Sequence, residues 1–468
     1  MNTIPQPTVA IAGGGLAGLA AACALADSGF RVTLLERRPY LGGRASSYEH
    51  PGTGEVIDNC QHVLFRVCTN LIEFYCRIGV EDKIRWYDEM TFIEPGGRTS
   101  VMHASPLPAP LHTAPSFLRF PFLDVKDKFA ISRAIAALTL TQQLDTGKSF
   151  LDFCRDHGQT ENAIERFWKP ILVSALSEDL DLISISYAAQ VVRESMKSPA
   201  ARHMGVPMLP LTELYNRAGD YIRARNGQIQ FRTSLKTFSA DESQIKIHGA
   251  GREESFDYLI VSLPFDAIER VLPETPAAAP LREKLTHFEP CPITGIHLWF
   301  DRQISDLDHA VLLDRTIQWM FHKSRLLAVQ GAANAESSGS YIELVVSASK
   351  YLIEKSRAEI VDLVLAEVRE FFPAARAANL VKSTVIKEVH ATYSPRPGID
   401  AYRPPQATAW PRVFLAGDWT VTGWPATMEG AVRSGYLAAE ALLHAAGIAN
   451  KRFLVPDLPA SGLMRLFS

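Results

Sequence analysis

Three glycines near the N-terminus, Gly13, Gly15 and Gly18, have the spacing of a turn that binds a pyrophosphate group. The first glycine of such a turn permits a sharp change of direction, and the second lets backbone N–H groups approach the phosphates. The third allows a helix to pack closely on a strand. Glu36 follows at a distance suited to accepting hydrogen bonds from ribose hydroxyls. These residue types predict a dinucleotide site.

The glycine turn binds a dinucleotide only where a strand leads into it and a helix leaves it. Residues 8–12 are predicted to form a buried strand, and residues 16–26 an apolar helix that begins with Leu16 and Ala17. A second strand is predicted at residues 31–35, directly before the acid. The N-terminus of the helix presents the positive end of its dipole to the phosphates. A purely structural glycine turn does not explain all of these features together.

A glycine pair and an arginine follow the acidic residue. An ordinary basic surface loop would explain Arg37. Such a loop explains Gly42, Gly43 and Arg44 poorly. Here the chain resembles the superfamily of FAD-dependent amine oxidases and phytoene desaturases, in which a Gly-Gly-Arg segment follows the ribose-binding acid and lies along the pyrophosphate. The resemblance implies that the cofactor is FAD rather than NAD.

A second part of the same resemblance lies near the C-terminus. Residues 412–417 are predicted as a buried strand that ends at Asp418, and Met428 lies near the start of a helix that runs to about residue 443. In the superfamily, the Gly-Asp carboxylate reaches the ribityl and pyrophosphate region, and the N-terminus of the Met-Glu-Gly-Ala helix faces the flavin. The resemblance therefore implies further cofactor contacts at Gly417, Asp418, Thr427 and Met428, and a backbone contact to adenine near Leu235.

The fold class implied by the resemblance is α/β, with a Rossmann-like FAD-binding domain and a discontinuous α+β substrate domain, as in two-domain flavoproteins of the amine oxidase type. The FAD-binding segments are expected at residues 1–95, 205–285 and 405–447. The substrate domain is expected at residues 96–204 and 286–404, and an apolar C-terminal tail at residues 448–468.

The composition is that of a globular enzyme, with 47% hydrophobic and 21% charged residues among 468. A formal net charge of −3 argues against nucleic acid as a partner. The six cysteines form no C-x-x-C pair, which favours neither a metal site nor a redox dithiol. Residues 9–26 are apolar, but no basic residue precedes them and glycines interrupt them, so they predict neither a signal peptide nor a membrane span. We expect a cytoplasmic protein.

The segment from Asp58 to His62, together with residues 92–98, 106–112 and 167–170, resembles the squalene-associated branch of the superfamily, the hydroxysqualene dehydroxylases. This resemblance implies reductive conversion of hydroxysqualene to squalene by reduced FAD in hopanoid biosynthesis. It places His62 and Gln61 beside the flavin, as candidate proton donors to the leaving hydroxyl. A packing role for His62 is the alternative. The sequence indicates no electron donor for FAD.

The implied substrate, an apolar C30 isoprenoid, requires a long apolar tunnel. Residues 104–123 are rich in proline and phenylalanine, and they form either the mouth of the tunnel, in contact with a membrane, or an ordinary loop packed over the core. The apolar residues 453–468 are a second candidate for membrane contact. Peripheral attachment to the inner face of the cytoplasmic membrane is the corresponding expectation.

Three alternative functions stay open at this point. A carotenoid desaturase of the phytoene type would bind a similar apolar molecule but would oxidise it. An amine oxidase usually has a tyrosine directly before the Met-Glu-Gly helix, where this chain has Thr427, although Trp424 lies nearby. A non-catalytic protein that binds FAD and lipid is the third alternative.

Overall fold

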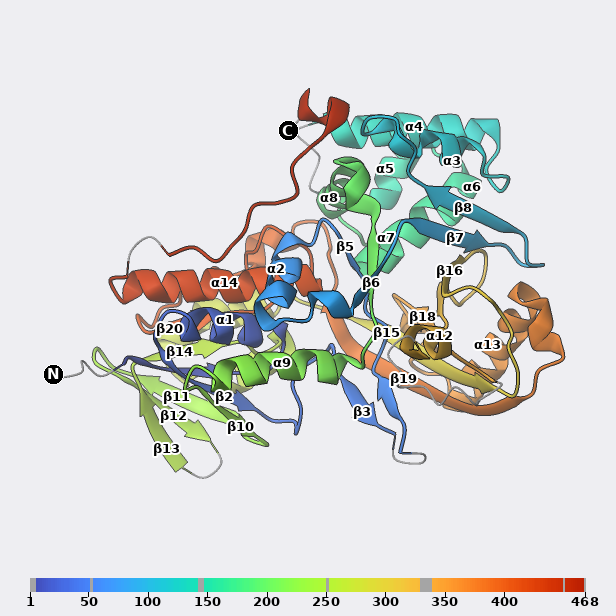
Figure 1. Ribbon diagram of the computed structural model, residues 1–468. Coiled ribbons are helices and arrows are strands. Elements are labelled where there is room, and N and C mark those ends of the chain that lie inside the picture. The colour runs from blue at the N-terminus through green and yellow to red at the C-terminus, as the bar shows by residue number, and fades with distance from the viewer. Residues whose placement is uncertain are drawn as a thin grey trace.

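The computed structural model describes residues 6–50, 54–141, 147–249, 252–328, 339–448 and 451–466. A five-stranded parallel sheet forms the centre of one half of the molecule (Figure 1). Its order is β10-β2-β1-β14-β20, with the bounds β10 (Gln228–Phe231), β2 (Arg31–Glu36), β1 (Thr8–Ala12), β14 (Tyr258–Val261) and β20 (Val413–Leu415). These strands come from four distant segments of the chain.

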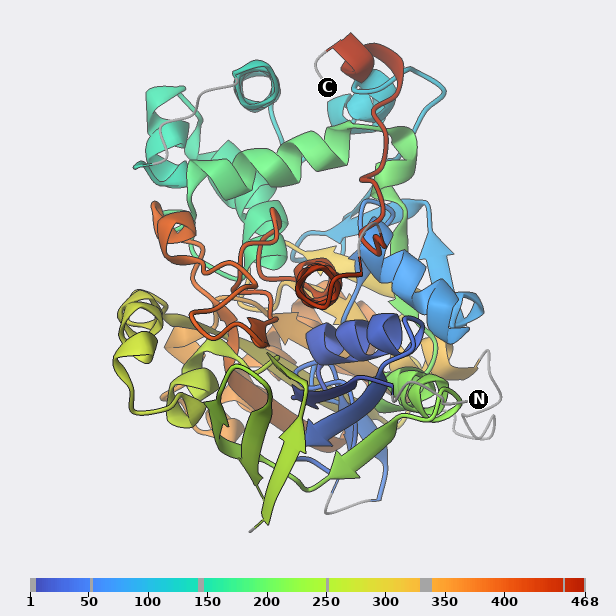
Figure 2. The ribbon, with the colours of Figure 1, turned by 90° about the vertical axis from the view of Figure 1, so that its left-hand side faces the viewer.

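Two helices from opposite ends of the chain, α1 (Leu16–Ala26) and α14 (Met428–Ala445), pack together beside this sheet (Figures 1 and 2). All residues of α1 are buried. Gly435 permits the close approach, because a Cβ atom there would lie 2.2 Å from the carbonyl oxygen of Ala17. Further helices in this half are α2 (Thr69–Ile78) and α9 (Leu211–Arg223).

A seven-stranded sheet dominates the other half, in the order β19-β15-β18-β17-β16-β7-β8. Helix α13 (Arg357–Phe371) packs its apolar face against it, and this contact forms a separate hydrophobic core. The strands are β19 (Leu380–Tyr393), β15 (Pro290–Phe300), β18 (Ser340–Val346), β17 (Trp319–Phe321), β16 (His309–Leu312), β7 (Glu89–Ile93) and β8 (Thr99–His103).

A layer of helices lies at the end of the molecule opposite the small sheet β11–β13 (Figures 1 and 2). It contains α3 (Ala114–Leu118), α4 (Val125–Leu140), α5 (Phe150–Asp156), α6 (Glu161–Ala163), α7 (Lys169–Leu176) and α8 (Ile185–Met196). The last described residues, a 3-10 helix at Gly462–Leu466, pack against this layer.

Shorter elements complete the fold. The strands are β3 (Ser47–Glu49), β4 (Val56–Asp58), β5 (Leu64–Phe65), β6 (Ile84–Tyr87), β9 (Met204–Pro207), β11 (Leu235–Ala240), β12 (Ile245–Gly249) and β13 (Arg252–Phe256). The helices are α10 (Phe265–Ile268), α11 (Ala279–Leu285) and α12 (Lys323–Ala328).

The predicted local elements are largely confirmed. Strand β1 and helix α1 have the predicted bounds, and β2 is one residue longer than predicted. The strand predicted at residues 412–417 was too long, because Gly417, with φ of +142°, has already left the extended conformation. We keep the division into two domains as a proposal, with one change. Its first boundary belongs before Glu89, because β7 pairs with β16 in the seven-stranded sheet.

Candidate active site

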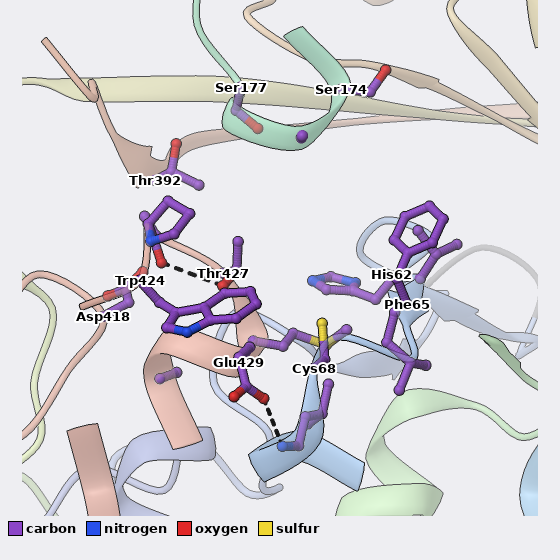
Figure 3. A pocket seen from close by; sticks show the side chains of 18 of the residues that line it. His62, Phe65, Cys68, Ser174, Ser177, Thr392, Asp418, Trp424, Thr427 and Glu429 are labelled. Carbon is purple, nitrogen blue, oxygen red and sulfur yellow. Dashed lines mark hydrogen bonds between the residues drawn. The ribbon is translucent and has the colours of Figure 1, made fainter. Parts of the chain in front are cut away.

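One continuous cavity of about 1350 Å³ extends from the N-terminal glycine turn to the helical layer. Its first part is lined by the glycine turn, residues 42–44 and the start of α14. Its second part is lined mainly by apolar side chains, among them Met90, Phe92, Phe117, Ile135, Phe167 and Trp319. Figure 3 shows the region where the two parts meet, with His62 and Trp424 facing each other across the cavity.

The glycine turn has the geometry that a bound pyrophosphate requires. Gly13 has a φ of +112°, and a Cβ atom at Gly18 would lie 2.0 Å from its carbonyl oxygen. The backbone of Gly15 faces open space, since a Cβ atom there would meet only the Cα of Gly43, at 3.8 Å. An isolated β-bridge joins Gly15 to Gly42, which lines the cavity as well. The turn and the Gly-Gly-Arg segment thus form one wall of the cavity.

Glu36 holds the two loops of this wall in place. Its carboxylate accepts hydrogen bonds from the backbone N–H groups of Gly14 and Arg38, both at 2.7 Å. Both oxygens keep further lone pairs, so the carboxylate can still accept hydrogen bonds from ribose hydroxyls. Arg37 lines the cavity beside it, and Leu235, at the start of β11, lies on the same wall.

Arg44 and Asp418 join the N-terminal and C-terminal parts of the site. The guanidinium of Arg44 lies 2.7 Å from the Asp418 carboxylate and also donates to the carbonyl of Ala391. Asp418 is largely buried, and both partners of the pair line the cavity. Sequence analysis identified both residues but not the contact between them, because 374 residues separate them in the chain.

The start of α14 faces the cavity, as expected. Thr427 caps this helix, because its side-chain oxygen accepts a hydrogen bond from the N–H of Gly430 at 3.1 Å. The side chain of Thr427 therefore stabilises the first turn of α14. The sulfur of Met428 accepts a hydrogen bond from the hydroxyl of Tyr215. Glu429 is fully buried and accepts hydrogen bonds from Asn70 and the N–H of Leu71, which fixes α14 to α2.

His62 presents one ring nitrogen to the cavity. Its Nδ1 lies 2.8 Å from the carbonyl oxygen of Cys60, which can only accept a hydrogen bond. The proton of the neutral ring is therefore on Nδ1, and Nε2 is an acceptor. Burial lowers the pKa of His62 below its ordinary value, which favours this neutral form.

A buried lysine, which sequence analysis missed, supports the segment that carries His62. Lys323, at the start of α12, donates to the Asp58 carboxylate at 2.7 Å and to Oε1 of Gln61 at 2.8 Å. Glu343 lies 3.6 Å away on β18 and is fully buried. The Gln61 side chain is thus turned toward Lys323, and its amide donates to the carbonyl of His62. Both polar ends of the Gln61 side chain are thus engaged within the protein. No local pattern marks a single lysine as buried.

Neither a membrane span nor a metal site is found in the described ranges. None of the helices there is long and apolar enough to cross a membrane. No group of three potential metal ligands occurs among these residues. All six cysteines are free thiols.

Comparisons with known proteins identify the family. Residues 16–443 match the family of flavin-containing amine oxidoreductases. The chain is 29% identical to a 15-cis-phytoene desaturase from Synechococcus elongatus, over 93% of this chain and 95% of that protein. It is 27% identical to a zeta-carotene desaturase from Synechocystis, over 93% and 97%.

Solved structures show the same fold at lower identity. Putrescine oxidase bound to putrescine superposes with a TM-score of 0.70 at 17% identity, covering 95% of this chain and 99% of that one. Cyclohexylamine oxidase from Brevibacterium oxydans superposes with a TM-score of 0.65 at 18% identity, covering 95% and 100%. These likenesses confirm the two-domain α/β architecture with a parallel sheet.

The comparisons correct one expectation. The hydroxysqualene dehydroxylase assignment was wrong, because the named relatives are phytoene and zeta-carotene desaturases, as in the carotenoid alternative. The short segments that suggested the squalene-associated branch lie partly in loops and do not define a substrate. The cofactor is FAD, and the open glycine turn, Glu36 and the Arg44–Asp418 pair fit it. The chain belongs to the family of flavin-containing amine oxidoreductases.

Proposed function

We propose that this protein is an FAD-dependent desaturase of a long, apolar isoprenoid. The observation that carries the proposal is the single cavity, which joins the dinucleotide wall to a long apolar section between the seven-stranded sheet and the helical layer. Most of the surface of that section is apolar, although polar side chains, Ser174 and Thr392 among them, also line it (Figure 3). A hydrocarbon chain is the ligand that such a lining favours. The names of the desaturase relatives support the same substrate class.

The geometry of His62 suits an oxidative reaction. When bound, FAD supplies a two-electron oxidant that accepts a hydride from a C–H bond. A C=C bond forms only if the adjacent carbon also loses a proton. We assign that proton to Nε2 of His62, which is an unprotonated acceptor because Nδ1 donates to the carbonyl of Cys60. The sequence analysis expected a proton donor here, and the hydrogen bond to Cys60 favours an acceptor instead.

Lys323 and Asp58 hold this base in position. Asp58 accepts hydrogen bonds from the Ser47 hydroxyl at 2.6 Å and the N–H of Leu211 at 3.1 Å, in addition to that from Lys323. Segment 58–62 is therefore fixed at its beginning by charge and hydrogen bonds. A base fixed in this way needs little reorganisation when substrate binds.

The experiment is an anaerobic reaction of the purified, FAD-loaded protein with 15-cis-phytoene, zeta-carotene or a C30 analogue in detergent micelles. Loss of oxidised-flavin absorbance together with a longer polyene chromophore is the expected result. His62→Ala should lower kcat by about 10²- to 10⁴-fold with little change in KM. His444→Ala, on the exposed end of α14, is the matched control and should leave kcat unchanged. Reduction of the flavin by putrescine or cyclohexylamine, but by no polyene, would refute the proposed substrate class.

A second part of the proposal concerns the outer end of the cavity. Large apolar side chains are exposed on α3, α4 and the C-terminal 3-10 helix, including Leu118, Val125, Phe129 and Leu466. Three exposed leucines, Leu111, Leu140 and Leu463, also line the cavity, so it opens within this apolar face.

We propose that this apolar face rests on a membrane from which the substrate enters. The exposed basic residues Arg119, Lys126 and Arg133 lie among the apolar ones, which favours a bilayer with anionic lipids. Residues 104–123 contribute both to the mouth of the cavity and to the loop packed over the core, which the sequence suggested as alternatives. Leu111 and Phe117 line the cavity, whereas Phe120 and Phe122 pack in the core.

A further inference from the structure

Arg403 is a buried arginine that binds one loop at several points. It directly follows the 3-10 helix Ile399–Tyr402 and is 5% exposed. The loop comprises residues 418–424, between β20 and α14. The guanidinium donates to four acceptors of this loop, which are the carbonyls of Thr420 at 2.9 Å, Asp418 at 3.1 Å and Trp424 at 2.8 Å, and the hydroxyl of Thr422 at 2.8 Å. A single side chain therefore determines the path of the whole loop.

This loop contributes to both parts of the main cavity. The Asp418 side chain forms the ion pair with Arg44 beside the dinucleotide wall. The Trp424 side chain lines the cavity opposite His62 (Figure 3). The backbone carbonyls of Asp418 and Trp424 accept hydrogen bonds from the same nitrogen of Arg403, Nη2. The cofactor side and the substrate side of the loop thus share one point of attachment.

The remaining nitrogen of Arg403, Nη1, connects the loop to the substrate half. It donates to the hydroxyl oxygen of Tyr187, in the first turn of α8, at 3.0 Å, and it lies 3.3 Å from the carboxylate of Asp400. The Tyr187 hydroxyl is 2.7 Å from the same carboxylate and 3.1 Å from the hydroxyl of Tyr393, at the end of β19. Arg403 therefore joins the loop to the helical layer and to the seven-stranded sheet.

The chemistry of the side chain suits this task. A guanidinium presents five N–H donors in one plane, so it can bind acceptors that lie in different directions. A lysine ammonium is a compact point charge and cannot span the same set of acceptors. Without the guanidinium, three buried carbonyls of the loop lose this donor, which is unfavourable unless the loop rearranges.

A second, smaller cavity of about 270 Å³ gives access to Arg403 from the surface. It is lined by Ser186, Tyr187, Gln190, Asp400, Arg403, Val421 and Gly423. Asp400 and Val421 are exposed, so this cavity is open to solvent. A small cation from solution can therefore reach the place of the guanidinium when the Arg403 side chain is removed.

We propose that Arg403 is a positioning residue, which places Asp418 for FAD and Trp424 for the substrate through one set of hydrogen bonds. Its loss should weaken FAD binding and slow the reaction together, because both side chains belong to the loop that it holds. The part that concerns turnover rests on the proposed desaturase function, whereas the part that concerns FAD binding does not.

The test is chemical rescue of Arg403→Ala by guanidinium. FAD affinity is measured by fluorescence titration of the apoprotein, and kcat is measured with 15-cis-phytoene at saturating FAD. We expect the variant to lose about 10- to 100-fold in each quantity. Guanidinium, at millimolar concentrations far below those that unfold proteins, should restore most of both losses. Ammonium should not, because it lacks the planar set of donors.

Two further variants separate positioning from a general effect on stability. Arg412→Ala is the matched control, because Arg412 also donates to backbone carbonyls, those of Glu242 and Asp257, but lines neither cavity. It should keep the wild-type FAD affinity and kcat and should not respond to guanidinium. Arg403→Lys keeps a charge at the site and decides the matter if Arg403→Ala does not fold. It should bind FAD about tenfold more weakly, without rescue, because the lysine occupies the place of the cation.

Two results would overturn the proposal. One is an FAD affinity equal to that of the wild type in either Arg403 variant. The other is a loss in Arg403→Ala that guanidinium does not reverse, since the effect would then come from the fold rather than from these hydrogen bonds. A wild-type protein that oxidises no polyene would refute the proposed function instead, and the measurements of FAD affinity would still test the role of Arg403.

Discussion

Glu343 is expected to make the stability of this protein fall as the pH rises from 5 to 7. Its side chain is fully buried on β18, and neither carboxyl oxygen has a hydrogen-bond partner. The nearest cation, Lys323, lies 3.6 Å away and is already bound to Asp58 at 2.7 Å. Burial raises the pKa of Glu343 from 4.5 to about 8. At neutral pH the cluster therefore contains one ionised carboxylate and one neutral carboxyl group.

The direction of this pH dependence follows from the pKa of Glu343 in the unfolded chain and in the folded protein. In the unfolded chain Glu343 ionises near pH 4.5, whereas in the folded protein it keeps its proton up to about pH 8. Its contribution to stability is complete below pH 4.5, decreases between the two values and is lost above pH 8. In this range each pH unit lowers the free energy of unfolding by about 1.4 kcal/mol. The expected loss between pH 5 and pH 7 is about 3 kcal/mol.

The assay compares Glu343→Gln with the wild-type protein by urea unfolding at pH 5, 6 and 7, at a fixed excess of FAD. Glutamine cannot ionise, so the difference between the two unfolding free energies isolates the Glu343 contribution. That difference should change by about 3 kcal/mol across the range. Glu354→Gln, at an exposed position, is the control and should show no such change. A constant difference for Glu343→Gln would mean that the folded protein contains an ionised Glu343, which would refute the charge assignment of the cluster.

Three further predictions follow from contacts described above. Gly435→Ala should lower the free energy of unfolding by about 1–3 kcal/mol in urea titrations, because its methyl group would collide with the Ala17 carbonyl. Arg44→Met should reduce FAD occupancy of the purified protein, measured from the ratio of flavin to protein absorbance, because Asp418 would lose its ion pair between the two parts of the site. Phe129→Asp should decrease co-sedimentation with anionic vesicles and leave turnover of micellar substrate unchanged, because this exposed side chain lies outside the cavity lining.

The cofactor half of the site could be predicted because its signals are local. A glycine turn between a buried strand and an apolar helix is determined by neighbouring residues, and the bounds of β1 and α1 were predicted correctly. The ion pair of Arg44 with Asp418 is different, since it depends on how distant segments meet. Each residue was identified, but the geometry that unites them required the fold.

The substrate half could not be predicted in the same way. Lys323 has no sequence pattern that marks it as buried, since its surroundings come from strands far away in the chain. The specific substrate and reaction, dehydroxylation of hydroxysqualene, were misjudged for a related reason. It depends on the shape and lining of a cavity built from many single side chains, whereas the prediction used a few short segments.

The contact between α1 and α14 also has a consequence for biosynthesis. The ribosome releases the glycine turn and α1 long before α14, which packs on α1 at Gly435. The parallel sheet is likewise incomplete until Val413–Leu415 has been made. A nascent chain that has not yet reached β20 and α14 therefore has an incomplete cofactor site, and an early stop codon before them would yield a product without a complete binding pocket.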